Sequence, residues 1–199
     1  MSVLRSAVTA AAGLAIALPG AALAGGGVTI SSYGQRAVLI QGGGQSVLLN
    51  PYQAVGCAAG LPEPRITAGV ILANSELADE GARGIAGGRF LVEPGSYRVG
   101  GLSLEGFASP HDRIEGRRFG NATIWRWQQG GLNFAHVGAT AGAITGADRV
   151  LLGNPDVLIL GVGGGSKIYN AEEAAALVKQ LNPKRVIPVQ YVTGDAPEG

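Results

Sequence analysis

Residues 156–191 form the segment that most constrains the fold of this chain. The run 156–160, which is apolar after Asp156, is followed by the glycine-rich loop 161–165 and then by residues 171–181, which the sequence predicts as its clearest helix. Asn170 stands at the N-cap position and Glu173 follows three residues later, the pattern of a capping box. A second apolar run ends at Gln190, so the segment predicts a buried strand, a loop, a capped helix and another strand.

The rest of the chain contains many short apolar or β-branched runs separated by glycine pairs and triplets, which favours a sheet-rich fold. The first three runs predict a β-meander that ends at Asn50-Pro51, because proline cannot donate to a strand ladder. Helices separate two strand clusters, near 27–100 and 101–199, which indicates an α/β fold: an αββα sandwich of two stacked mixed sheets flanked by helices. Strands are expected at 28–32, 37–41, 46–49, 68–73, 88–92, 95–99 and 102–109, a hairpin at 123–128 and 132–137, and short helices within 74–82 and 145–152.

Composition excludes several functions. The chain has 199 residues and a net charge of +1, and no basic run is longer than Arg117-Arg118, so no electrostatic footprint for nucleic acid is present. Its single cysteine, Cys57, cannot form an internal disulfide and has no second thiol for a cysteine-rich zinc site. The length of the chain suits one domain, residues 25–199, with a sizeable core.

The first 24 residues differ from the rest of the chain. One arginine precedes an alanine-rich apolar stretch, and Ala22-Leu23-Ala24 follows as an A-x-A cleavage site. This pattern predicts a cleaved export signal, and hence a mature protein in the periplasm or an equivalent lumen. The alternative is a helix retained as an anchor, but the apolar stretch is short for a bilayer. No other apolar run approaches membrane-spanning length, so the mature form is not expected to span a membrane.

Five blocks in order along residues 28–193 resemble the UlaG-like branch of the metallo-β-lactamase superfamily. They are the meander 28–51, the segment VILANSELADEG at 70–81, the motif ASPHD at 108–112, the segment FAHVGAT at 134–140, and the closing segment 156–191. The resemblance implies a metallo-hydrolase frame in which an H-x-H-x-D-H signature, a single histidine, an aspartate and a final histidine hold two metal ions. Such ions generate the attacking water of a hydrolase.

Seven positions of this chain correspond to the ligands that the resemblance implies. Asp79 and His111 match, whereas Ser75, Leu77, Glu80, Ala139 and Gln190 replace family ligands. Leucine and alanine cannot bind a metal, and a carboxamide oxygen is a weak zinc ligand, so neither a cofactor nor a binuclear zinc centre is expected. A single divalent cation on Asp79, Glu80, His111 and Gln190 is an open alternative. Asn50 stands where the family has aspartate, and His136 is interpreted as a structural, hydrogen-bonded imidazole.

Two further patterns carry less weight. Ser75, Asp79 and His111 supply the residue types of a metal-free nucleophile, acid and base, although the fold arranges these positions for metal binding. The glycine loop at 161–165 lacks the closing residues of a nucleotide-binding loop.

We therefore expect an exported protein of the metallo-β-lactamase fold, non-catalytic or strongly altered, that binds a small molecule or an envelope protein in the old cleft. The alternative is a divalent-metal-dependent hydrolase of an ester, lactone, amide or phosphodiester bond, with Asp79 as its catalytic residue and Asp79 and His111 as metal ligands. A third reading is a structural module of an envelope complex, which an exposed apolar patch would indicate.

Overall fold

The computed structural model describes residues 27–138 and 140–191. Its first sheet begins with an antiparallel meander and continues with two strands added in parallel. The spatial order is β1 (Thr29–Ser32), β2 (Val38–Gly42), β3 (Gln45–Leu49), β4 (Thr67–Leu72) and β5 (Gly87–Leu91). The predicted meander is confirmed, and Asn50 follows β3 directly, where the proline at 51 ends the strand.

The second sheet is antiparallel through its first four strands and parallel where the last two strands are added. Its spatial order is β11 (Arg185–Val189), β10 (Val157–Gly161), β9 (Leu132–His136), β8 (Asn121–Gln129), β7 (Leu102–Pro110) and β6 (Gly95–Val99). Both sheets are thus mixed, as predicted, and the β8–β9 hairpin forms around Gly130-Gly131.

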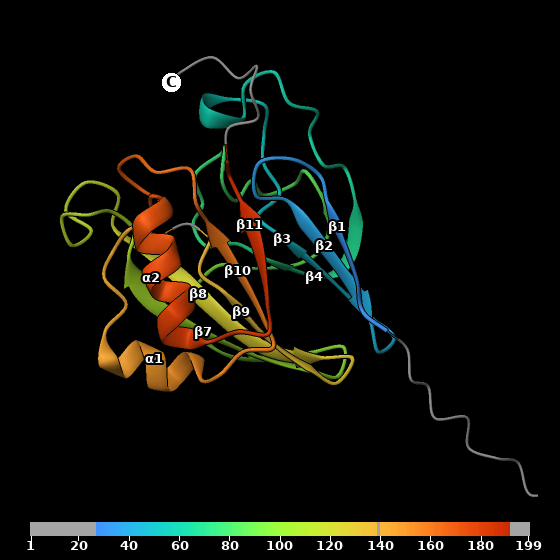
Figure 1. Cartoon of the computed structure of the whole chain (residues 1–199). Coiled ribbons are helices and arrows are strands. Elements are labelled where there is room, and N and C mark those ends of the chain that lie inside the picture. Colours follow the sequence, from blue (N-terminus) through green and yellow to red (C-terminus); the bar gives the residue numbers. More distant parts are fainter. Residues whose placement is uncertain (1–26, 139, 192–199) are drawn as a thin grey trace, which may run out of the picture.

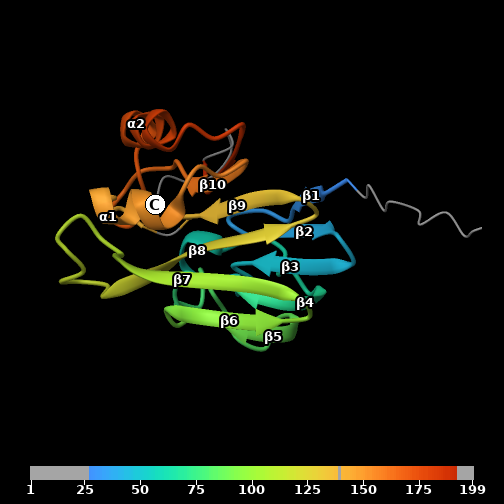
Figure 2. The same ribbon diagram turned by 90° about the horizontal axis from the view of Figure 1, so that it is seen from below.

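The two sheets stack face to face and bury the main core between them (Figures 1 and 2). Successive side chains of a strand point to opposite faces, so Trp125 and Trp127 of β8 enter this core while Ile124 faces the other way. Trp127 stacks on Phe134 with ring centroids 5.0 Å apart. The predicted placement of both tryptophans against a core is confirmed.

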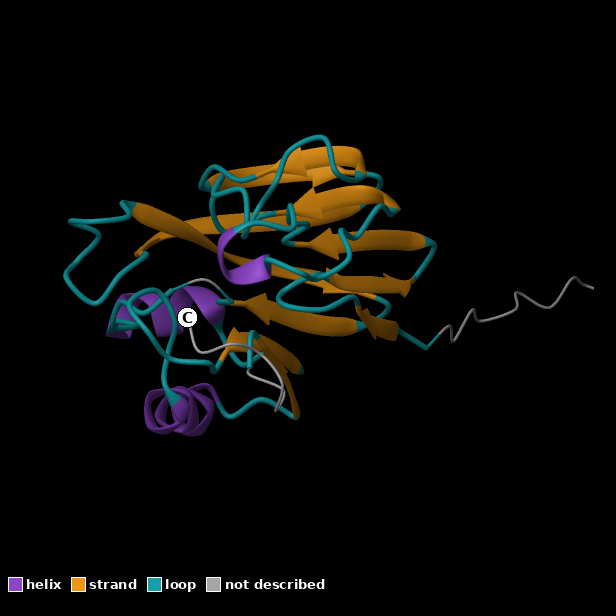
Figure 3. Ribbon diagram, turned by 90° about the horizontal axis from the view of Figure 1, so that it is seen from above, coloured by secondary structure: helices purple, strands orange, loops and turns teal. Residues whose placement is uncertain are grey.

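Two α-helices, α1 (Gly146–Leu152) and α2 (Ala171–Leu181), pack on the outer face of the second sheet (Figures 1 and 3). Asn170 and Glu173 form the predicted capping box of α2, and Thr145 and Asp148 form another at α1. The outer face of the first sheet is covered by a smaller apolar cluster that includes side chains of Ile66, Ala86 and Phe90. A short 3-10 helix, η1 (Gly56–Ala58), precedes β4. The sandwich is therefore confirmed, with both described α-helices on one side.

Two details differ from the sequence-based expectations. Residues 74–82 form turns and no helix, because the side chains of Ser75 and Glu80 bond inward. The predicted strands around Pro94 form, but β5 and β6 belong to different sheets, so the chain changes sheets at 92–94 rather than near 100. Thr123 of β8 fixes this crossing by donating from Oγ1 to the carbonyl of Val92 at 2.5 Å.

The predicted export signal, residues 1–24, lies outside the described residues, and so does Ala139. Within the described ranges, no helix has the length and apolar character needed to cross a membrane.

Candidate functional site

A cluster of buried charged side chains surrounds Glu80, in the turn that follows β4. Arg36 Nη2 lies 2.8 Å from Glu80 Oε1, and Lys167 Nζ contacts the same oxygen. His111 Nε2 lies 3.0 Å from Glu80 Oε2, to which Ser75 Oγ also donates a hydrogen bond of 3.0 Å. These side chains come from the β1–β2 connection, the ends of β4 and β7 and the β10–α2 loop, so the cluster lies where the ends of both sheets meet.

Glu80 is ionised at neutral pH despite its burial. Removal from water alone would raise the pKa of this carboxyl, but the contact with His111 and the charge of Arg36 hold the pKa well below its usual range. Glu80, Arg36 and His111 are fully buried, and the Lys167 side chain is 14% exposed. Two basic side chains thus share one carboxylate.

Asp79 does not join this cluster, although it is adjacent to Glu80 in the chain. Its Oδ2 accepts a hydrogen bond from the backbone N–H of Cys57 at 3.2 Å. A β-carbon at Gly56 would lie 2.8 Å from the same oxygen, so Asp79 packs against η1. Leu77 is 37% exposed and contributes to the wall of a nearby cavity.

His111 is held in place by an ordered loop. Its backbone N–H donates to the carbonyl of Gly120 at 3.0 Å. The neighbouring Asp112 accepts four backbone N–H bonds of 2.8–3.0 Å, from residues 114, 116, 118 and 119. Desolvation opposes ionisation of Asp112, but these four donors lower its pKa. Asp112 therefore organises the loop that presents His111 and Phe119.

Gln190 lies near the same edge but is not among the groups that contact Glu80. Its backbone is left-handed, with φ 55°, and its N–H donates to the carbonyl of Gln35 at 2.7 Å. Its Oε1 is buried without a hydrogen-bond partner among the described residues. The close approach explains the glycine at 163, where a β-carbon would lie 2.1 Å from the Gln190 carbonyl oxygen.

His136 is fully buried in β9. Desolvation is the main cause that lowers its pKa to about 3, the Ile159 carbonyl opposes the shift, and the charge of Arg36 adds to it. The imidazole is more fully buried than the sequence predicted, and it lies beside the Ile159 backbone of the neighbouring strand β10.

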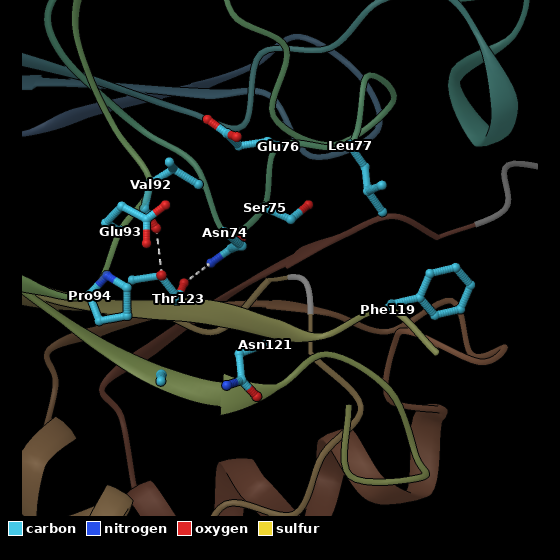
Figure 4. A pocket seen from close by; sticks show the side chains of 11 residues that line it. Asn74, Ser75, Glu76, Leu77, Val92, Glu93, Pro94, Phe119, Asn121 and Thr123 are labelled. Atoms are coloured by element: carbon cyan, nitrogen blue, oxygen red, sulfur yellow. Dashed lines mark hydrogen bonds between the residues drawn. The ribbon is translucent and has the colours of Figure 1, made fainter. Parts of the chain in front are cut away.

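A cavity of about 430 Å³ opens beside the cluster (Figure 4). Leu77 and Phe119 lie at one end, and Glu93 and Pro94 at the other, with Ser75 between them. Its remaining lining residues are Asn74, Glu76, Val92, Ala108, Asn121 and Thr123. Ser75 is therefore shared by the cavity and the charged cluster.

Hydrogen bonds fix the floor of this cavity. Asn74 Nδ2 donates to the Thr123 carbonyl at 2.7 Å, which ties the first sheet to the second. Asn50 Nδ2 donates to Asn74 Oδ1 at 2.6 Å, and Asn50 Oδ1 accepts from Asn74 N at 2.9 Å. An asparagine at 50 supplies both a donor and an acceptor here, whereas an ionised aspartate would supply acceptors only.

The described residues do not fit a binuclear zinc centre. Zinc sites use three or four converging nitrogen, sulfur or carboxylate ligands. Here Asp79 bonds to the backbone of η1, Leu77 lines the nearby cavity, and Glu80 contacts basic side chains. The described ranges contain no group of three or more His, Cys, Asp or Glu residues able to hold a metal. The Ser75, Asp79 and His111 set is not assembled either, since Ser75 donates to Glu80.

Three of the predicted site residues, Ser75, Glu80 and His111, lie together in the structure. The sequence-based prediction gave no role to Arg36 or Lys167. Arg36 directly precedes the apolar residues 37–40, and a charged residue beside a buried apolar run is unusual unless the charge is paired. That was a usable signal. Lys167 follows a glycine loop and has no comparable signal.

The two mixed sheets, the helices outside them and the cleft at the strand ends together define a hydrolase-like protein of the metallo-β-lactamase fold. Residues 29–190 match the family model described as the beta-lactamase superfamily domain, and the chain therefore belongs to this family.

Solved structures share the fold. A proposed Zn-dependent hydrolase of the metallo-β-lactamase superfamily from Thermotoga maritima is 23% identical, with a TM-score of 0.66 over 84% of this chain and 77% of that chain. A proposed metal-dependent hydrolase from Parabacteroides distasonis is 14% identical, with a TM-score of 0.62 over 86% and 84% of the two chains. An isothiocyanate hydrolase from Delia radicum gut bacteria is 12% identical, with a TM-score of 0.62 over 81% and 84%. The comparison with curated proteins finds no match.

Proposed function

We propose that this chain is an exported member of the UlaG-like branch that binds a small molecule in the cavity beside Glu80 and does not hydrolyse it. The observation that carries the proposal is the separation of the ligand positions next to an open cavity. Asp79 bonds to the η1 backbone and Leu77 lines the cavity wall, while about 430 Å³ of space remains accessible. This volume lies in the range of small-molecule sites.

The chemistry of the cluster supports binding rather than hydrolysis. Metal-dependent hydrolases generate their nucleophile by lowering the pKa of a metal-bound water. Glu80 lacks free coordination sites, because Arg36, Lys167, His111 and Ser75 already contact its oxygens. Its lowered pKa also makes it a weak general base at neutral pH.

A hydrolase with one divalent cation on Asp79 and His111 has less support. It requires Asp79 to leave its hydrogen bond with Cys57 and turn toward His111, which now contacts Glu80. Export is proposed from the leader-like first 24 residues, and the ligand is then a molecule of the periplasm or an equivalent lumen.

A small-molecule screen by ligand-observed NMR tests the proposal on protein purified without chelator. Ala108 is an exposed residue that lines the cavity, so the variant Ala108→Trp places an indole in the cavity. The matched control is Val150→Trp, at a site on α1 that is 79% exposed. Ligands of the parent are expected to be lost with Ala108→Trp and kept with Val150→Trp.

The same preparations are assayed against an ester, lactone and phosphodiester panel with added Mn²⁺ or Mg²⁺. We expect no turnover above the buffer rate. Turnover that disappears in both Asp79→Asn and His111→Ala would contradict the proposal and favour the single-cation hydrolase.

A further inference from the structure

Arg36 occupies an unusual environment for an arginine. Its side chain is fully buried, it lies two residues before β2, and its Nη2 atom is 2.8 Å from Glu80 Oε1. The Nε and Nη1 atoms have no hydrogen-bond partner among the described residues. A guanidinium is expensive to bury, so a charge that remains here must be compensated by the site around it.

Lys167 adds a second positive charge to the same carboxylate oxygen. Its ammonium reaches Glu80 from the β10–α2 loop and also lies 5.1 Å from the centroid of the Phe119 ring. The loop is anchored by Arg113, which donates to the Gly165 and Ile168 carbonyls at 2.9 Å each. Lys167 is thus held at the cluster by a fixed loop.

The position of these two cations is informative. Arg36 and Lys167 share the carboxylate of Glu80, and the imidazole of His111 contacts the other oxygen of this carboxylate. The family resemblance places metal ligands at positions 80 and 111. A metal ion at such a site contributes positive charge that holds carboxylate and imidazole ligands together. Here basic side chains supply that charge from within the chain.

We propose that Arg36 and Lys167 take the place of the metal ions, so that the site is assembled and neutralised by built-in cations. This inference rests on the proposed function and deepens it, because it states why the cleft keeps its shape without a metal. It predicts that the parent protein does not respond to zinc or to chelator, and that removing the two cations while adding a ligand makes the site accept zinc.

The double variant Arg36→His/Lys167→Met is designed for this purpose. The imidazole at position 36 is shorter than the guanidinium, which leaves space for an ion between it and Glu80. With His111 it completes a set of two histidines and one glutamate, a common ligand set of catalytic zinc sites. The variant Arg36→Met/Lys167→Met removes the same charges without adding a ligand.

A control applies the same chemistry elsewhere on the chain. Arg126→His/Lys184→Met alters two ion pairs that are more exposed, those of Arg126 with Glu105 and of Lys184 with Asp156. Each protein is dialysed against zinc and then against metal-free buffer, its zinc is measured by elemental analysis, and its thermal midpoint is measured with zinc and with EDTA. Lys167→Met alone provides a mild variant that is expected to fold.

We expect near-stoichiometric zinc only in Arg36→His/Lys167→Met. Its midpoint is expected to rise by roughly 5–10 °C at a hundredfold excess of zinc over Kd. The parent and the Arg126→His/Lys184→Met control are expected to retain only trace zinc and to show equal midpoints with zinc and EDTA.

Three outcomes would overturn the inference, and they are distinguishable. Stoichiometric zinc in the parent would contradict both the inference and the proposed function. A folded Arg36→His/Lys167→Met that retains no zinc would contradict the inference alone, and so would a Lys167→Met variant that is as stable as the parent. Ligand binding lost with Ala108→Trp would still support the proposed function in that case.

Discussion

The variant Glu80→Gln tests the energetic role of the buried cluster. It removes the negative charge and keeps the size of the side chain, so Arg36 remains buried beside a neutral amide with no carboxylate to compensate it. Removing one partner of a buried pair costs about 3–5 kcal/mol, because the remaining charge stays desolvated. For a domain of this size the thermal midpoint is then expected to fall by roughly 6–20 °C.

Urea unfolding at pH 7, followed by the fluorescence of the buried Trp125 and Trp127, measures this loss. The matched control is Glu105→Gln, which breaks the ion pair with Arg126, where both side chains are 39% exposed. Exposed pairs contribute only about 0–1 kcal/mol, so the control is expected to stay close to the parent. Arg36→Met in the Glu80→Gln background should recover part of the loss, since it removes the uncompensated charge.

Acid supplies a second test of the same variant. The pKa of Glu80 is lower in the folded state than the unfolded value of about 4.3. Its stabilising contribution is therefore present above that value and is lost as the pH falls below it. The difference in unfolding free energy between the parent and Glu80→Gln should stay constant down to about pH 4.3 and shrink as the pH is lowered further, toward about 3. A Glu80→Gln variant that loses no more stability than Glu105→Gln would refute the reasoning.

Three further outcomes are expected. His136, whose pKa is lowered to about 3, stays neutral in the folded state, while the unfolded imidazole gains a proton below about pH 6.5. This imidazole alone should therefore cost the parent roughly 3 kcal/mol between pH 7.5 and pH 4.5, and His136→Gln should lose less stability over this range in urea unfolding. Asp112→Ala removes four acceptor contacts from the loop 112–120 and should speed tryptic cleavage at Arg117 severalfold, whereas Asp148→Ala, at the start of α1, should not. Asn170→Ala removes the N-cap of α2 and should cost about 1 kcal/mol in urea unfolding.

Much of the fold could be predicted from the sequence because its signals are local. The meander, the β8–β9 hairpin and the capping box at Asn170 each depend on residues that are close in the chain. The change of sheet between β5 and β6 could not be predicted, since it depends on a hydrogen bond between Val92 and Thr123, 31 positions apart. A turn at Pro94 is equally compatible with a hairpin.

The candidate site was only partly predictable, for a similar reason. Ser75, Glu80 and His111 could be brought together through the family resemblance, but Arg36 and Lys167 belong to connections that no ligand motif marks. Asp79 and Glu80 are adjacent in the chain, yet Asp79 bonds to the backbone of Cys57 and Glu80 contacts Arg36. Sequence alone does not give the direction of side chains in a turn.

Zinc content tests the central claim, a cleft assembled by built-in cations, most directly. Elemental analysis of the parent protein, purified without chelator and incubated with excess zinc before dialysis, is expected to find only trace zinc, with a thermal midpoint that EDTA leaves unchanged. Near-stoichiometric zinc that is lost in His111→Ala would contradict the claim.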